Sequence, residues 1–302
     1  MPQRVFIAGE HGQIAQALAG AYNLRGDHVA LVGRSTISVT DQRHLLSAVI
    51  TFNPDLVVNA AAYNAVDKAE DDKEAAFAIN RDGAGFVAAA AVAAGVPVIH
   101  LSTDYVFDGR KQAPYLETDP TNPLTVYGES KLAGEIAVAS CAGNHVILRT
   151  SWVCSPIGQN FVKTMLRLAR DRDEVAVVDD QWGTLTFAAD LAAAIMSIGD
   201  KFASADDCSG FSGIYHASSA GETTWYRLAR EIMAQSAVKG GPACRVRAIA
   251  SSEYRTRAKR PADSRLDCSK LKRVFGISLP RWQTSLETCL DLLIDQTAGT
   301  SI

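Results

Sequence analysis

The sequence has little excess charge and few aromatic residues. Its 302 residues include 30 Lys and Arg, 33 Asp and Glu and 7% aromatics, which leaves a net charge of -3 at pH 7. A chain so close to neutral has no bulk attraction to nucleic acid or to an anionic membrane. Hydrophobic residues make up 47% of it, which excludes a disordered or collagen-like chain. We therefore expect a globular protein with no nucleic-acid or membrane partner, and the composition leaves both a monomer and a homodimer open.

Uninterrupted apolar runs and paired cysteines are also missing. The one long apolar stretch, residues 83–101, is mostly alanine and is interrupted by Gly95 and Pro97, so a helix followed by a buried strand explains it better than a membrane span. Met1 to Gly9 already has the pattern of a strand and a glycine turn, which leaves no room for a signal peptide. Six scattered cysteines without a Cys-x-x-Cys pair are expected to be reduced thiols. These absences favour the cytosol.

Apolar runs of strand length alternate with helix-length segments through the first half of the chain. The runs are continuous in Val, Ile and Leu, which is typical of strands covered on both faces; they lie at residues 5–8, 28–32, 56–59, 96–101 and 146–148. Strands separated by helices predict an α/β fold with a doubly wound, Rossmann-like parallel sheet. Further helices are predicted at residues 161–170, 190–198 and 224–238.

The second half is less regular and predicts a smaller, partly interleaved α+β domain. We place a dinucleotide-binding domain at residues 1–150 and a domain that mainly binds substrate at residues 151–302. The segment at about residues 175–215 is expected to return to the first domain.

A glycine turn follows the first strand and opens a helix. Gly9 and Gly12 belong to a Gly-x-x-Gly-x-x-Ala pattern, in which the glycines let the backbone approach a pyrophosphate at the helix N-terminus. The second strand ends in Leu-Val-Gly-Arg-Ser, without the carboxylate that usually holds the ribose of NAD. Arg34 at this point can pair with the 2′-phosphate of NADP, although a solvated surface arginine is the alternative. NADPH is the expected cofactor, and NADH is a possible substitute.

Three residues carry the expected chemistry. Thr103 lies at the end of the fourth predicted strand, and Tyr127 and Lys131 are four residues apart at the start of a helix, on one face. Hydride addition to a carbonyl leaves negative charge on its oxygen, which a tyrosine hydroxyl can protonate and a threonine hydroxyl can stabilise. A neighbouring ammonium is expected to lower the pKa of the tyrosine and to bind the nicotinamide ribose. We predict these roles for Tyr127, Thr103 and Lys131, respectively.

With these motifs in place, the chain resembles the dTDP-4-dehydrorhamnose reductase family of extended short-chain dehydrogenases. The resemblance runs in order through residues 59–70 (NAAAYNAVDKAE), 102–107 (STDYVF), 126–135 (VYGESKLAGE), 149–153 (RTSWV) and 260–266 (RPADSRL). It implies NADPH-dependent reduction of the C4 keto group of dTDP-6-deoxy-L-lyxo-4-hexulose to dTDP-L-rhamnose. The residues that it implies as cofactor contacts are Gly12, Gln13, Ile14, Ser38, Val39, Ala62, Tyr63 and Asn64. The residues that it implies as sugar-nucleotide contacts are Thr103, Asp104, Tyr105, Trp152 and Arg260.

The chain departs from the family at three places. The acidic residues that the family often has at the end of the second strand are absent, which argues against NADH. Leu185 replaces a proline of the family's pattern near the sugar. Some relatives dimerise through magnesium held by glutamates, one of them from the first helix, where this chain has Ala17. We therefore predict no metal site.

Two other functions are open at this point. A sugar-nucleotide epimerase or dehydratase with tightly bound NAD is the second enzymatic possibility; the missing carboxylates after the second strand argue against it. A regulatory subunit that binds NADP without catalysis is the alternative of a different class. The complete set of Thr103, Tyr127 and Lys131 argues against this, since binding alone does not require it.

Overall fold

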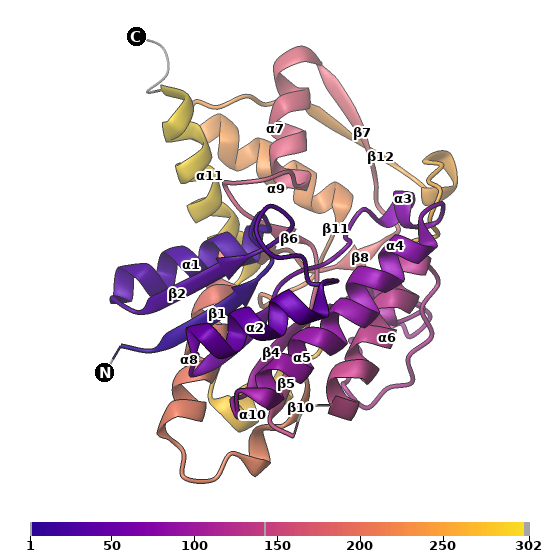
Figure 1. Ribbon diagram of the computed structural model, residues 1–302. Coiled ribbons are helices and arrows are strands. Elements are labelled where there is room, and N and C mark those ends of the chain that lie inside the picture. Colours follow the sequence, from indigo (N-terminus) through magenta and orange to yellow (C-terminus); the bar gives the residue numbers. More distant parts are fainter. Residues whose placement is uncertain (1, 142, 299–302) are drawn as a thin grey trace.

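A six-stranded parallel sheet forms the centre of the computed structural model, which describes residues 2–141 and 143–298 (Figure 1). Its strand order is β10-β5-β4-β3-β1-β2, and each neighbouring pair is parallel. The strands are β1 (Arg4–Ala8), β2 (His28–Val32), β3 (Leu56–Asn59), β4 (Val98–Thr103), β5 (His145–Thr150) and β10 (Gly213–His216). The doubly wound parallel sheet expected from the continuous apolar runs is confirmed.

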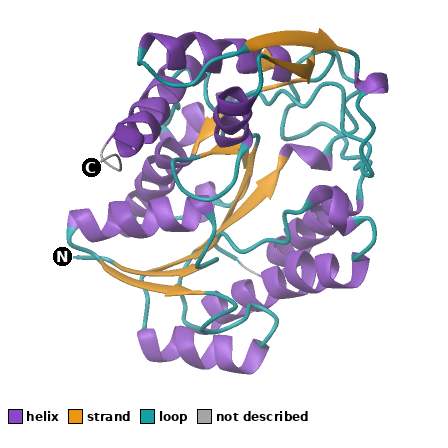
Figure 2. Ribbon diagram, turned by 90° about the horizontal axis from the view of Figure 1, so that it is seen from above, coloured by secondary structure: helices purple, strands orange, loops and turns teal. Residues whose placement is uncertain are grey.

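Helices cover both faces of this sheet (Figure 2). One face packs against α1 (Gln13–Arg25), α8 (Ala188–Ser204) and α10 (Ser269–Phe275). The other face packs against α2 (Gln42–Phe52), α5 (Ala84–Ala93) and α6 (Val126–Cys141). The two apolar layers bury apolar side chains from both faces of the central strands, which is why those strands show no polar alternation.

The alanine-rich stretch that the sequence predicts to begin as a helix is part of a longer helical segment, which forms in three consecutive pieces. After the short α3 (Val66–Ala69) come α4 (Lys73–Phe77), a π-helical segment (Ala78–Gly83) and α5. The π-helical segment contains the buried Asn80. A π-helical turn inside a helix often lies at a functional site, because it redirects side chains at a cost in regular hydrogen bonding.

A smaller unit with its own apolar core lies beside the carboxyl ends of the strands, at the top of Figure 1. Its helices are α7 (Phe161–Asp171), α9 (Trp225–Val238) and α11 (Trp282–Ala298). Its short strands pair as β7 (Glu174–Val178) with β12 (Arg245–Ile249), β8 (Trp182–Gly183) with β11 (Thr223–Thr224), and β6 (Val153–Cys154) with β9 (Thr186–Phe187). Short 3-10 turns cover Asp104–Val106, Ser209–Phe211 and Ser251–Glu253. No helix in the described ranges is both long and apolar enough to cross a membrane.

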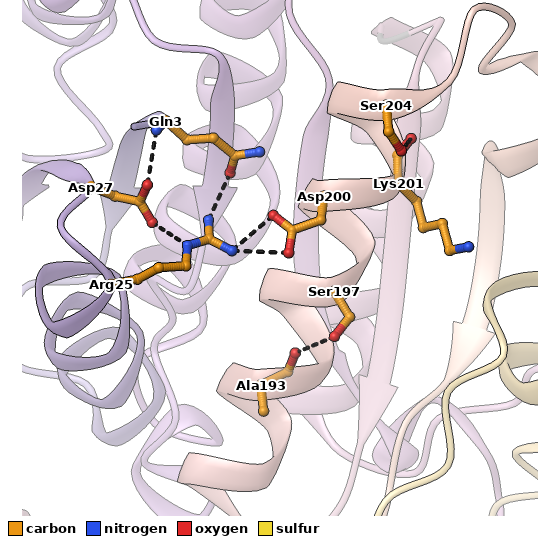
Figure 3. Close-up of polar contacts among 8 residues, drawn as sticks. All are labelled: Gln3, Arg25, Asp27, Ala193, Ser197, Asp200, Lys201 and Ser204. Atoms are coloured by element: carbon orange, nitrogen blue, oxygen red, sulfur yellow. Dashed lines mark hydrogen bonds and ion pairs between the residues drawn. The ribbon is translucent and has the colours of Figure 1, made fainter. Parts of the chain in front are cut away.

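Three elements from the second half of the chain join the large sheet, and one of them is the helix α10. Strand β10 extends it beside β5, and α8 lies against α1. At the amino ends of the strands, Arg25 from α1 donates to Asp27 (2.6 Å) and to Asp200 of α8 (2.8 Å), as Figure 3 shows. The side chain of Gln3 also accepts a hydrogen bond from Arg25 (3.1 Å). This network ties the start of the chain to a helix about 175 residues away.

Candidate active site

Two adjoining cavities lie at the carboxyl ends of the strands, the edge at which open α/β sheets bind ligands. Their volumes are about 420 and 320 Å³, and both are lined by Gly12, Ala60, Ala62 and Asn64. The first, here the nucleotide cavity, also contains Gly9, Arg34, Ser38, Val39 and Tyr63. The second, here the catalytic cavity, also contains Gln13, Ile14, Thr103, Asp104, Tyr105, Tyr127, Lys131 and Trp152. Every residue predicted for the site except Arg260 therefore lines one of two connected spaces.

The glycine turn brings the backbone of β1 against the end of β3. Gly9 has a φ of +124°, and a Cβ at this position would lie 2.7 Å from the carbonyl carbon of Ala60. Gly12 precedes α1, and no side chain in the described part of the protein caps this helix. The first N–H groups of α1 are therefore available to an anion, and the turn fits the pyrophosphate of a dinucleotide.

Asn80 holds the loop that lines both cavities. Its Oδ1 accepts from the backbone N–H of Tyr63 (2.8 Å), and its Nδ2 donates to the carbonyl oxygen of Tyr63 (3.0 Å) and to the hydroxyl of Ser130 (2.9 Å). The π-helical segment thus connects the loop at Tyr63, which lines both cavities, to α6. The sequence analysis missed Asn80, although an amide inside an alanine-rich helical stretch is a signal that would find it.

Two glycines let α6 lie close to its neighbours, which positions Tyr127. A Cβ on Gly128 would be 2.3 Å from the carbonyl oxygen of Tyr105, and one on Gly134 would be 2.0 Å from that of Asn80. The ring of Tyr127 then packs edge-to-face on Tyr105, with 5.8 Å between ring centroids. A larger residue at either glycine would move the helix and the hydroxyl that it carries.

The hydroxyl of Tyr127 is a phenol, not a phenolate, at neutral pH. Burial raises its pKa to about 12, while a hydrogen bond with Thr103 opposes the rise and the charge of Asp104 adds to it. The sequence-based expectation that Lys131 lowers this pKa is not met, because the desolvation of the phenolate outweighs other contributions. The protonated form is nevertheless the one that a proton donor needs.

Lys131 lies at the bottom of the catalytic cavity and contacts the sheet. Its Nζ donates to the carbonyl oxygen of Leu101 (2.6 Å), and burial lowers its pKa to about 8, while Glu135 opposes that change. One turn further along α6, Glu135 accepts two hydrogen bonds from Arg149 of β5 (2.9 and 2.7 Å) and one from Ser102. This buried ion pair joins α6 to β4 and β5 directly beneath Thr103 and Lys131.

Thr103 and Asp104 form a connected polar pair at the end of β4. The hydroxyl of Thr103 donates to Asp104 Oδ1 (3.1 Å) and accepts from the N–H of Tyr105 (3.2 Å). Burial raises the pKa of Asp104 to about 7, against hydrogen bonds from Ser264 and Thr103 that lower it. Burial therefore favours the protonated form of this carboxyl group.

An aromatic wall closes the catalytic cavity on the side of the smaller unit. Trp152 has a φ of +44°, and its ring stacks on Trp225 at 3.6 Å between centroids. Gly183 permits this position, since a Cβ there would lie 2.5 Å from the Trp152 ring. The sequence analysis missed Trp225, which lines the same cavity.

Arg260 lies outside the residues that line the two cavities. It forms an ion pair with Asp67 of α3, with 2.7 Å between Nη2 and Oδ2. Burial lowers the pKa of the Arg260 guanidinium, but the hydrogen bond with Asp67 and the nearby Tyr105 together raise it above its ordinary value. The structure thus places Arg260 beside a residue of the catalytic cavity, in contact with the first half of the chain.

Comparisons with known proteins place the chain in a family. Residues 3–294 match the family described as the RmlD substrate binding domain. The chain belongs to this family. It is 48% identical over 283 residues to a dTDP-4-dehydrorhamnose reductase of Sinorhizobium fredii, covering 93% of this chain and 95% of the relative. It is 40% identical to the Escherichia coli K12 protein of the same name, covering 97% of this chain and 99% of that protein.

A solved structure of this family has the same fold. The dTDP-4-dehydrorhamnose reductase of Bacillus anthracis, crystallised with NADP, superposes with a TM-score of 0.90 at 31% identity. The match covers 96% of this chain and 99% of that one. The resemblance found in the motifs is therefore confirmed over nearly the whole chain.

Proposed function

We propose that this RmlD-family protein reduces the C4 keto group of dTDP-6-deoxy-L-lyxo-4-hexulose to give dTDP-L-rhamnose, with NADPH as the preferred reductant and NADH as a substitute. The observation that carries the proposal is the convergence of Thr103, Tyr127 and Lys131 in one cavity that adjoins the nucleotide cavity. Two further findings support it: relatives at 48% and 40% identity are named for this reaction, and one at 31% was crystallised with NADP.

The roles of the three residues follow from their chemistry. When bound, NADPH supplies the hydride that forms the new C–H bond at C4. When the substrate binds, the hydroxyl of Thr103 turns its proton from Asp104 to the keto oxygen and fixes that oxygen beside Tyr127. The phenol of Tyr127 transfers its proton to that oxygen, which becomes the product hydroxyl, and the phenolate is reprotonated from solvent. The ammonium of Lys131, which donates to the carbonyl oxygen of Leu101, binds the ribose next to the nicotinamide.

The remaining predicted contacts belong to the same proposal. Gly9, Gly12, Gln13 and Ile14 hold the pyrophosphate through backbone groups, and Arg34, Ser38, Val39, Ala62, Tyr63 and Asn64 line the path of the dinucleotide. Asp104, Tyr105 and Trp152 contact the sugar nucleotide. Arg260 contacts its diphosphate, for which it would exchange its ion pair with Asp67.

The proposal includes the arrangement of the chain. Residues 1–150 form the cofactor-binding domain and residues 151–302 mainly the substrate domain, with part of the segment near residues 175–215 returned to the first. The contacts of α8 and β10 with the large sheet support this division. We also propose a cytosolic protein, since six cysteines without a disulfide framework suit a reducing compartment.

The test is a spectrophotometric assay of NADPH and NADH oxidation with enzymatically prepared dTDP-6-deoxy-L-lyxo-4-hexulose. Replacing Tyr127 with Phe should lower kcat by about 10²- to 10⁴-fold, the usual contribution of a positioned proton donor, while NADP⁺ still binds. Tyr226→Phe on α9, which lies outside both cavities, is the matched control and should keep full activity. Folded protein that binds NADPH but turns over neither reductant would contradict the reductase and favour a regulatory NADP-binding subunit.

A further inference from the structure

A carboxylate reaches the end of β2 from a part of the chain where the sequence pattern does not place it. Glu10 belongs to the glycine turn after β1, and its side chain lies over Gly33 and Ser35. The hydroxyl of Ser35 donates to Glu10 Oε2, and the backbone N–H of Glu10 donates to the carbonyl oxygen of Val32 (3.0 Å). The end of β2 therefore has an acidic group after all.

The fit of Glu10 in this place depends on the absence of a side chain at residue 33. A Cβ on Gly33 would be 2.5 Å from the Cβ of Glu10 and 3.2 Å from its Oε2. Only 20% of the Glu10 side chain is exposed, so the carboxylate is packed against the strand end and does not point freely into solvent. The hydrogen bond from Ser35 and the space above Gly33 together fix its position.

The charged side chains around Glu10 are not paired with one another, so they are available to a ligand in the nucleotide cavity. The nucleotide cavity is lined by Glu10 together with the exposed cations Arg34 and Lys68. Within residues 2–141 and 143–298, the sole ion-pair partner of Glu10 is His11, at 3.7 Å, and His11 is charged only when protonated. One acidic and two basic side chains thus face the same space without neutralising one another.

This space is where the adenosine ribose lies in dinucleotide-binding folds. A carboxylate at the end of the second strand accepts hydrogen bonds from the ribose hydroxyls of NAD, whereas an arginine there accommodates the 2′-phosphate of NADP. A phosphate that carries nearly two negative charges is repelled by a fixed carboxylate in a partly buried site, because solvent screens the interaction incompletely. Arg34 therefore favours binding of the 2′-phosphate of NADP, and Glu10 opposes it.

We propose that Glu10 is a specificity-determining residue that weakens the binding of the 2′-phosphate and accepts a hydrogen bond from the 2′-hydroxyl of NAD(H). It reduces the NADPH preference that Arg34 confers and allows the protein to use NADH. The inference rests on the proposed cofactor use but not on the proposed sugar substrate. It also reverses one argument from the sequence, in which the absence of an acidic residue after β2 spoke against NADH.

The test is isothermal titration calorimetry of NADP⁺ and of NAD⁺ with the full-length protein and its variants. In Glu10→Gln the ratio of Kd for NAD⁺ to Kd for NADP⁺ should rise about tenfold, which is the size of one charge interaction at an intermediate effective dielectric. In Arg34→Ala the ratio should fall, because only NADP⁺ loses a partner. Glu74→Gln, the same charge change on the exposed part of α4, is the control and should leave the ratio unchanged.

Competition with adenosine nucleotides tests whether Glu10 acts on the 2′-phosphate itself. Adenosine 2′,5′-bisphosphate should bind more tightly to Glu10→Gln than to the original protein, while 5′-AMP should bind equally or more weakly. The gain should shrink at high salt, as an electrostatic effect in a partly exposed site does. An unchanged ratio in Glu10→Gln, or equal changes for both nucleotides, would overturn the proposal. These titrations contain no sugar nucleotide, so failure of the reductase proposal alone would leave their outcome intact.

Discussion

The carboxyl ends and the amino ends of the strands form two opposite edges of the large sheet, and at each edge an arginine binds carboxylate side chains. The two networks differ in their contact with water. At the carboxyl edge, Arg149 and Glu135 are both 2% exposed and lie beneath the catalytic residues. At the amino edge, Arg25 is 33% exposed and Asp200 is 52% exposed. Figure 3 shows the contact between these two side chains. The hydrogen-bond geometry is similar, with contacts of 2.6 to 2.9 Å in both networks.

The difference indicates that burial, and not the number of contacts, decides how much free energy such a network contributes to folding. In the buried pair, loss of one partner leaves a charge without water, so the pair fixes α6 against β4 and β5. In the network around Arg25, water replaces the exposed partner Asp200 when it is lost, so that contact contributes little free energy to folding. Catalysis requires the first kind, since Thr103 and Lys131 must be held within a fraction of an ångström.

Among variants that test this comparison, Arg149→Ala should change the free energy of unfolding most. It leaves the Glu135 carboxylate buried and unpaired, so the free energy of unfolding should fall by about 3–5 kcal/mol, measured by urea denaturation. The double variant Arg149→Met with Glu135→Leu should recover most of this loss, because no unpaired charge remains. A single variant as stable as the original protein would contradict the argument from burial.

The next effect is the pH dependence of stability at the carboxyl edge. Asp104 has a folded pKa of about 7 against an ordinary value of 3.8, so between about pH 4 and 7 the folded protein keeps a proton that the unfolded chain has released. The free energy of unfolding should therefore fall as pH rises through this window, by at most about 4 kcal/mol. Asp104→Asn should remove this contribution, whereas Asp171→Asn on the exposed end of α7 should not. Equal slopes in denaturation series of all three proteins would exclude the effect.

The smallest effect belongs to the amino edge. Asp200→Ala should lower the free energy of unfolding by about 0.2–1 kcal/mol, and less at high salt, because Arg25 keeps Asp27 and gains water. The measurement is the same urea titration at two salt concentrations. A loss as large as that in Arg149→Ala would show that exposure does not separate the two networks.

Much of the candidate site was predictable because its signals are local. The glycine turn, the step from Tyr127 to Lys131 and the position of Thr103 after a strand each depend on a few consecutive residues. The parallel sheet followed from continuous apolar runs in the same way. The predictions that failed concern quantities set by distant neighbours. The pKa of Tyr127 follows from how much of the chain surrounds it, and no spacing in the sequence states that.

Residues that act through a partner far away in the chain were missed for the same reason. Trp225 lies in the catalytic cavity because it stacks on Trp152, 73 positions earlier in the sequence. Asn80 acts through hydrogen bonds to Tyr63 and Ser130, which lie 17 and 50 positions away in the sequence. Strand β10 is short and enters the sheet beside β5 without a pattern of its own that distinguishes it from loop.

The sequence by itself determined the fold class, the cofactor-binding turn and the three residues of the proposed chemistry, since strand, turn and helix patterns are properties of neighbouring residues. Only the tertiary structure decided the electrostatics of the site. It buried Glu135 against Arg149, raised the pKa of Asp104, and brought the carboxylate of Glu10 to Ser35, 25 residues away. The physical reason is that charge interactions depend on distance and on the exclusion of water, and both are set by packing between segments that are remote in the chain.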